Sequence, residues 1–254
     1  MKGIGFVMLG RRTLSIFATF ILLIAASFSA LATPSNANDK PAKTGSEKVR
    51  VETPLNLAIL VQDDLVSRVG SELNVTRDFI RGLPSGSRVM IAYVTTGSLK
   101  VRQPFTTDLE QAAKALRTPA GSTAASPYNP YVEVIEALRS FEARGEKRNA
   151  LLLISDGLDT SHGFDSDAAA NTIDLLRAIK EAQKKSVAIY SFYAPTVGLT
   201  SWNSLAINYG QSSLNRLSNE TGGKAFFQGT GFVTFDSYFD RLRQALNDQY
   251  AKAF

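Results

Sequence analysis

The sequence predicts an α/β fold, a three-layer α/β/α sandwich in which helices cover both faces of a mainly parallel central sheet. The clearest observation is an unbroken apolar run at 150–154 that ends at once in Ser155, Asp156 and Gly157. A run without polar alternation is typical of a strand buried on both faces, as central parallel strands are. The second observation is that strand-like and helix-like segments alternate through the body of the chain, which is the pattern of a parallel sheet with crossover helices.

The composition divides the chain into three parts. Residues 1–37 combine positive charge, an apolar stretch and a small-x-small pattern, which predicts a signal peptide. Residues 38–53 belong to a polar stretch with Pro, Ser and Lys, which predicts a disordered linker. Residues 54–254 are enough for one domain with a sizeable core. We therefore expect an exported protein, periplasmic or extracellular, that contacts the membrane only if the N-terminal segment stays uncleaved as an anchor.

Strands and helices alternate in the first half of the domain. Apolar residues recur at helical spacing through 72–83, and the Pro-Ser-Gly that follows ends this helix. The alternation at 99–103, after a Thr-Gly-Ser turn, predicts a half-exposed edge strand. A loop of small and polar residues is expected at 118–130. The expected elements are strands at 55–61, 88–94 and 99–103, and helices at 72–83, 109–116 and 131–141.

The same alternation continues beyond the central strand. Apolar residues on one face predict a helix over 168–184, and a long loop at 194–211 is expected to carry Trp202 and Tyr209. Two glycines at 222 and 223 predict the end of a short helix. The remaining expected elements are strands at 187–193 and 224–227 and helices at 214–221 and 237–252.

Polar side chains follow several of these strands at the points where the strands end. They form three clusters, at 62–67, at 121–126 and at 155–157. Because the carboxyl ends of parallel strands meet at one edge, where open α/β sheets bind ligands, we expect the clusters to lie together. Carboxylate and hydroxyl oxygens are hard ligands suited to Mg²⁺, Mn²⁺ or Ca²⁺. The alternative is that these residues only cap helices and form turns.

Several classes of function are not supported by the composition and motifs. Cysteine is absent, and a net charge of +5 comes from scattered Lys and Arg, so we expect no nucleic-acid partner. The single histidine, His162, stands in a polar segment, and no Gly-x-Ser-x-Gly precedes a helix. The glycines around Leu83 lack the Lys-Ser/Thr of a phosphate-binding loop. We therefore expect no catalytic residue, no organic cofactor and no enzyme activity.

The order of motifs resembles that of the von Willebrand factor A (vWA) domain over about 55–254. The residues that carry the resemblance are the turn into the second strand at 83–89, the helix start at 105–108, the Ser-Asp-Gly strand end at 152–159 and the Glu-Thr-Gly-Gly segment within 214–226. The chain is most similar to secreted vWA-related proteins of the Acidobacteria type. The resemblance implies a non-catalytic domain that binds another protein, in an adhesion-type contact, through the carboxyl-end face of its sheet.

The resemblance also implies a divalent-cation site. Such domains hold the cation through Asp-x-Ser-x-Ser after the first strand, a Thr in a later loop and an Asp that Asp156 matches. The first motif has changed here, because Leu65 stands where a Ser ligand is expected. In the loop, either Thr123 or Ser126 can serve, and helix register favours Ser126. The resulting site, for Mg²⁺ or else Mn²⁺ or Ca²⁺, consists of Asp63, Asp64, Ser67, Ser126 and Asp156. The alternatives are a purely structural cation and a metal-dependent hydrolase.

Overall fold

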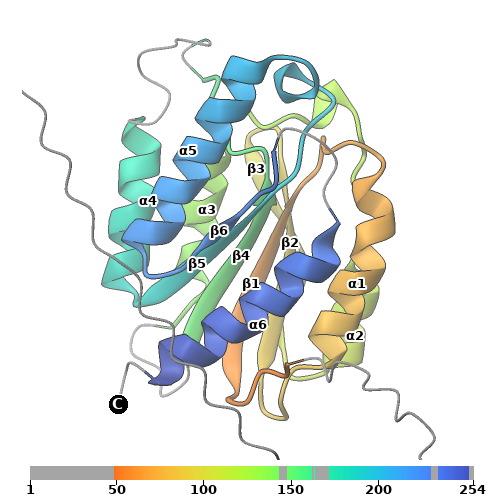
Figure 1. Cartoon of the computed structure of the whole chain (residues 1–254), viewed down its shortest axis with the longest axis vertical. Coiled ribbons are helices and arrows are strands. Elements are labelled where there is room, and N and C mark those ends of the chain that lie inside the picture. Colours follow the sequence, from red (N-terminus) through yellow and green to blue (C-terminus); the bar gives the residue numbers. More distant parts are fainter. Residues whose placement is uncertain (1–48, 143–147, 162, 164–171, 230–233, 252–254) are drawn as a thin grey trace, which may run out of the picture. The chain divides into compact units, whose positions relative to one another are not determined.

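A computed structural model describes residues 49–142, 148–161, 163, 172–229 and 234–251 of the chain (Figure 1). The expected signal peptide, most of the expected linker, and His162 lie outside these residues. Of the helix expected over 168–184, the first four residues lie outside them as well. None of the described helices is both long and apolar enough to cross a membrane.

One six-stranded sheet forms the middle layer, with strand order β3-β2-β1-β4-β5-β6. All pairs are parallel except β2 with β3, which is antiparallel and places β3 at an edge. The prediction of a mainly parallel α/β sheet is confirmed. The strands are β1 (Leu55–Gln62), β2 (Arg88–Thr95), β3 (Ser98–Thr106), β4 (Arg148–Ser155), β5 (Val187–Tyr193) and β6 (Ala225–Phe226).

Helices pack on both faces of this sheet, and each side has its own hydrophobic cluster (Figure 1). Side chains of α1, α2 and α6 pack with Ile59 of β1 on one face of the sheet. Side chains of α3, α4 and α5 pack with Leu60 of β1 on the other face. Adjacent residues of β1 are thus both buried, which is why its sequence shows no polar alternation. The helices are α1 (Val69–Arg81), α2 (Leu109–Ala115), α3 (Pro130–Arg139), α4 (Ile173–Lys184), α5 (Ser204–Glu220) and α6 (Phe235–Ala251), with short 3₁₀ helices η1 (Thr123–Ala125) and η2 (Leu199–Ser201).

The segment after β5 differs from the expected long loop at 194–211 and short helix at 214–221. The helix α5 already begins at Ser204, so Tyr209 lies inside a helix and not in a loop. The physical reason is a helix cap: the Asn203 side chain accepts hydrogen bonds from the backbone N–H groups of Leu205 and Ala206 at 3.0 and 3.1 Å. Trp202, the other aromatic residue expected in this loop, does lie outside a helix, between η2 and the Asn203 cap.

The strand order reverses direction between β1 and β4. The chain proceeds from β1 to β2 and β3 on one side, then crosses over to β4, β5 and β6 on the other. In doubly wound sheets, the crevice outside the carboxyl ends of two such strands is the usual ligand site. Gln62 ends β1 and Ser155 ends β4, so the first and third polar clusters of the sequence flank this crevice.

Helix α3 buries a carboxyl group whose charge is poorly compensated. Glu133 is buried, and its Oε2 has no hydrogen-bond partner among the described residues. Burial raises the pKa of Glu133 from 4.5 to about 7. Between these two pH values the native state binds more protons than the unfolded chain does, so this group lowers stability as the pH rises through that window.

We therefore expect Glu133→Gln to remove this part of the pH dependence of unfolding. The variant should be more stable than the wild type at pH 8 by about 1–2 kcal/mol, after allowance for solvent screening, and should gain little at pH 4.5. Urea unfolding at both pH values measures this. Glu142→Gln, an exposed change shortly after the same helix, is the control and should keep the wild-type profile. An unchanged pH slope in Glu133→Gln would contradict the expectation.

Candidate functional site

The side chain of Gln62 joins the ends of β1 and β4. Its amide nitrogen donates to Oδ1 of Asp64 at 2.8 Å. Its amide oxygen accepts from the Ser155 hydroxyl and, at 3.3 Å, from the backbone N–H of Asp156. Both Asp64 and Asp156 are buried, so one amide organises two acidic residues across the strand crevice. The sequence analysis did not assign Gln62 a role, although its place at the end of the first strand was a signal for one.

Asp156 is held in place by partners on both of its oxygens. Oδ1 accepts from the backbone N–H of Leu158 at 3.2 Å, and Oδ2 accepts from the Thr200 hydroxyl at 2.9 Å. Burial, with a further contribution from the charge of Asp64, raises the pKa of Asp156 from 3.8 to about 6. Thr200 could not be predicted as a site residue, because it lies in η2, far along the chain from the three polar clusters.

Asp64 keeps one oxygen without a hydrogen bond. The residue is 1% exposed, and its Oδ2 has no hydrogen-bond partner among the described residues. Burial raises the pKa of Asp64, while the Ser126 hydroxyl and the Gln62 amide act against this shift. Ser126 is therefore close enough to influence the carboxyl group, although it does not meet the geometry of a hydrogen bond to Oδ2. A buried carboxylate oxygen in this state is an unused ligand position.

A cavity of about 270 Å³ lies beside these groups. Gln62 and Asp156 reach it from the strand ends, and hydroxyl groups supply much of the remaining wall. The loop that carries Ser126 is fixed by the Thr96 hydroxyl, which donates to the carbonyl oxygens of Ala124 and Ser126 at 2.8 and 3.0 Å. Other wall residues are Thr123, Pro127, Tyr128, Leu158, Thr160, Thr196, Gly198 and Leu199.

The structure places three of the five predicted metal ligands near one another and separates the other two from them. The structure brings Asp64, Asp156 and Ser126 together, whereas Asp63 forms an ion pair elsewhere and Ser67 is exposed in the turn before α1. Among the described residues, no group of three or more acidic or histidine side chains is arranged to hold a metal ion. Leu65, which was expected to face the site, is part of the hydrophobic core instead.

Asp63 is neutralised by an arginine from the segment after α2. Nη1 and Nη2 of Arg117 donate to its two oxygens at 2.6 and 2.7 Å, and the backbone N–H of Ala120 donates to Oδ1 at 2.9 Å. Burial alone would raise the pKa of Asp63, but these donors hold it below its usual value. The Arg117 guanidinium also lies over the ring of Tyr93, 4.1 Å from its centroid. This arrangement positions the loop that follows, which leads to Ser126.

The start of α5 packs directly on the turn after β4. Gly157 has a φ of +71°, and a Cβ atom on it would lie 2.4 Å from Cγ of Leu214. A Cβ atom on Gly210 of α5 would lie 1.9 Å from the carbonyl oxygen of Asp156. Neither contact is possible for a real side chain, so glycine is required at both positions. The Tyr131 hydroxyl donates to the carbonyl oxygen of Gly157 at 2.6 Å and fixes the same turn from α3.

Four aromatic residues lie in or next to the segments around this cavity, namely Tyr128, Tyr193, Trp202 and Tyr209, and two of them are exposed. Tyr128 lines the cavity and is 64% exposed, and Trp202, which follows η2, is 71% exposed. Tyr193 is instead buried in β5, and Tyr209 lies in α5. Tyr and Trp are enriched at protein interfaces relative to the rest of the protein surface.

Neither a protein-family model nor a curated protein matches this sequence. Solved structures do share its fold. An aerotolerance-related membrane protein from Bacteroides fragilis NCTC 9343 aligns with 76% of this chain and 99% of its own, at 12% identity and a TM-score of 0.53. The conserved hypothetical protein BatB from Bacteroides thetaiotaomicron aligns with 78% of this chain and 99% of its own, at 14% identity and a TM-score of 0.53. The Rpn10 VWA domain aligns at 10% identity with a TM-score of 0.44, which carries no argument. At these identities the similarity shows the fold alone.

The ion pair between Asp63 and Arg117 gives a prediction about stability. Arg117→Gln leaves a buried carboxylate without its counter-charge, which we expect to destabilise the domain by about 1–3 kcal/mol at pH 7. The loss should shrink below the pKa of Asp63, where the carboxyl group is neutral. Thermal and urea unfolding at pH 7 and pH 3 measure both effects. Arg177→Gln breaks a more exposed pair with Asp174 and should change stability by less than about 0.5 kcal/mol. Equal effects of the two changes would contradict the prediction.

Proposed function

We propose that this domain is a non-catalytic binding module of an exported protein and that it binds another protein in an adhesion-type contact. The contact surface is the carboxyl-end face of the sheet, around the cavity that Tyr128 lines and next to Trp202. The narrower resemblance to secreted bacterial vWA-related proteins supports export, to the periplasm or beyond the cell. The similar solved structures support only the fold on which this proposal is built.

The observation that carries the proposal is the composition of this face. A polar, acidic cavity at the strand crevice is accompanied by two exposed aromatic side chains, Tyr128 and Trp202. Large aromatic side chains lose little conformational entropy on binding, and they anchor many protein contacts. The acidic groups behind the cavity are fixed by Gln62, Thr200 and backbone N–H groups, so they are already positioned to hold a polar group of a ligand.

A photo-crosslinker tests the proposed surface. We expect a crosslinkable residue at Tyr128 or Trp202 to capture a specific partner in the native cell envelope or secreted fraction, and one at Val101 to capture none. Val101 is exposed on the edge strand β3 and is the matched control. With the captured protein purified, Tyr128→Ala and Trp202→Ala should each weaken binding by about tenfold or more, without a change in melting temperature. Capture only from Val101 would overturn the proposal.

A divalent cation in the same site is a second candidate, favoured by the unused Oδ2 of Asp64. Asp64, Asp156 and Ser126 would hold it through hard oxygen atoms, as Mg²⁺, Mn²⁺ or Ca²⁺ prefers. Asp63 does not fit this role, because Arg117 occupies both of its oxygens. A bound cation would supply an open coordination position for a carboxylate on the partner protein, or would act only as a structural support. A metal-dependent hydrolase has no specific observation in its favour.

Calorimetry and thermal shift with Mg²⁺, Mn²⁺ and Ca²⁺ test the cation. We expect heat and a raised melting temperature in the wild type, and neither in Asp64→Asn or Asp156→Asn. Asp78→Asn, on the exposed side of α1, is the control and should bind as the wild type does. A wild type without heat and without a thermal shift would refute the cation, and direct protein binding would then be tested by the crosslinking experiment alone.

A further inference from the structure

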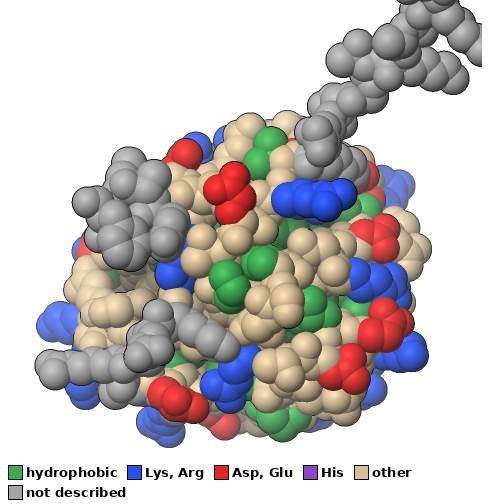
Figure 2. Space-filling view, turned by 90° about the horizontal axis from the view of Figure 1, so that it is seen from below, with side chains coloured by type: hydrophobic (Ala, Val, Ile, Leu, Met, Phe, Trp, Pro, Cys, Tyr) green, Lys and Arg blue, Asp and Glu red, His purple; other side chains and the backbone are tan. Residues whose placement is uncertain are grey.

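A second cavity, of about 610 Å³, lies at the opposite end of the sheet from the candidate site. Arg50 and Val51 line it just before β1 begins, and Leu83 and Pro84 line it between α1 and β2. Because β1 and β2 are parallel, both segments lie at the amino ends of their strands. Figure 2 views the domain from this end, where hydrophobic side chains lie among charged groups of both signs. This face as a whole therefore favours neither anionic nor cationic ligands, so a preference for one of them must come from the residues that line the cavity.

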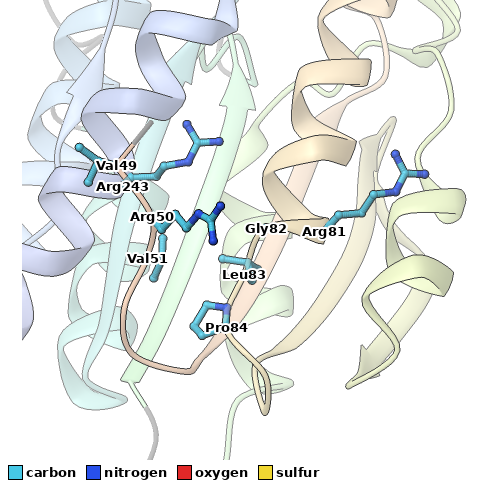
Figure 3. A pocket seen from close by; sticks show the side chains of 8 residues that line it. All are labelled: Val49, Arg50, Val51, Arg81, Gly82, Leu83, Pro84 and Arg243. Atoms are coloured by element: carbon cyan, nitrogen blue, oxygen red, sulfur yellow. The ribbon is translucent and has the colours of Figure 1, made fainter. Parts of the chain in front are cut away.

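Two guanidinium groups lie on the same side of this cavity. Figure 3 shows the side chains of Arg50 and Arg243 both extending into the space between α6 and α1, whereas Arg81 points away from them. The direction of Arg81 is explained by its ion pair with Glu110, from Nε to Oε2 at 2.7 Å and from Nη2 to Oε1 at 3.1 Å. Arg81 is thus neutralised by the protein, and Arg50 and Arg243 are the groups available to a ligand.

Arg243 is a mostly buried cation with an incomplete set of partners. Its side chain is 14% exposed and lies over the ring of Phe79, 5.3 Å from the ring centroid. Its one described hydrogen bond runs from Nη1 to Oδ1 of Asp240 at 2.9 Å, and Asp240 is about half exposed. Guanidinium groups of this burial are normally paired, because removing a charge from water is unfavourable. A single exposed acid on the same helix turn offsets only a small part of that penalty.

Arg50 is fixed next to Arg243 by its backbone. The Asn247 side chain of α6 donates to the carbonyl oxygen of Arg50 at 2.9 Å and accepts from the N–H of Glu52 at 3.2 Å. These two bonds attach the segment before β1 to the same helix that carries Arg243. The guanidinium of Arg50 itself is exposed, and no hydrogen bond joins it to any described residue. Two positive charges therefore line one cavity with a single counter-charge, that of Asp240, bound to one of them.

From this geometry we infer that the cavity between α1 and α6 binds a phosphate group through Arg50 and Arg243. Planar N–H pairs bind phosphate oxygens in bidentate fashion, and a phosphate group has enough oxygen atoms to accept from both guanidinium groups at once. Asp240 already offsets one of the two positive charges, so the selection of phosphate comes from this geometry and not from charge alone. The cavity is larger than a phosphate ion, so the organic part of the ligand lies against Val51, Leu83 and Pro84. Both a soluble phosphate ester and an anionic lipid headgroup offer this chemistry.

Isothermal titration and thermal shift on the full chain test the site, with inorganic phosphate and glycerol phosphate as probes at constant ionic strength. We expect saturable binding that Arg50→Gln weakens by about tenfold or more. Arg50→Lys keeps the charge but not the planar N–H pair, so its affinity should lie between that of the wild type and that of Arg50→Gln. Arg177→Gln is the control, because Arg177 also pairs with an acid three residues away but lines no part of the cavity. Arg243→Gln should abolish binding. If that variant fails to fold, the Arg50 variants still test the site, because Arg50 is exposed and its replacement should not disturb folding.

Vesicles distinguish the two sources of phosphate. If phosphatidylglycerol in phosphatidylcholine vesicles binds the chain in a way that Arg50→Gln weakens, and the soluble probes bind only weakly, then the ligand is a lipid headgroup. Saturable, Arg50-dependent binding of glycerol phosphate identifies a soluble ester. No Arg50-dependent binding to either probe, or binding that Arg177→Gln weakens equally, would overturn the inference.

Discussion

The rest of the candidate site depends on the hydrogen bonds of one amide, that of Gln62. Its nitrogen holds Asp64 of the segment after β1, and its oxygen receives donors from Ser155 and Asp156 at the end of β4. The charges of the buried carboxyl groups of Asp64 and Asp156 repel each other, which contributes to the raised pKa of Asp156. An amide at position 62 adds no third charge.

The parallel sheet separates two kinds of electrostatic surroundings. The carboxyl ends of β1 and β4 present Asp64 and Asp156, and the amino end of β1 presents Arg50 beside Arg243. Both sets of charges are incompletely compensated within the described residues, but they do not contact each other. The two proposals therefore stand independently: a protein partner at one end neither requires nor excludes a phosphate ligand at the other. A domain that binds both ligands at once would connect a protein partner at one end of the sheet to a phosphate-bearing molecule at the other.

The sequence predicted the sheet well because burial on both faces leaves a direct signal. The apolar runs at β1, β2, β4 and β5 fall where they were expected, and the edge position of β3 follows from its alternation. The start of α5 was missed because Gly210 and two serines lie in the middle of the helix, where they lower its helix propensity, and the cap by Asn203 decides where it begins. The ends of the strands predicted where the candidate site lies. They did not predict which acidic residue would be neutralised by an ion pair. That depended on Arg117, which approaches Asp63 from 54 residues further along the chain.

The close contact between Gly157 and Gly210 has a consequence for how this face recognises a ligand. With no side chain at either position, the backbone of α5 rests on the backbone of the turn after β4. Tyr131 of α3, on the same face of the sheet, also holds that turn in place. Atoms in direct contact leave no room for the helix to slide inward, so the floor of the cavity has its final shape before any ligand arrives. A preorganised floor loses little conformational entropy on association. Affinity at this face would then be set by the exposed rim, and variation of Tyr128 and Trp202 could change the partner without changing the fold.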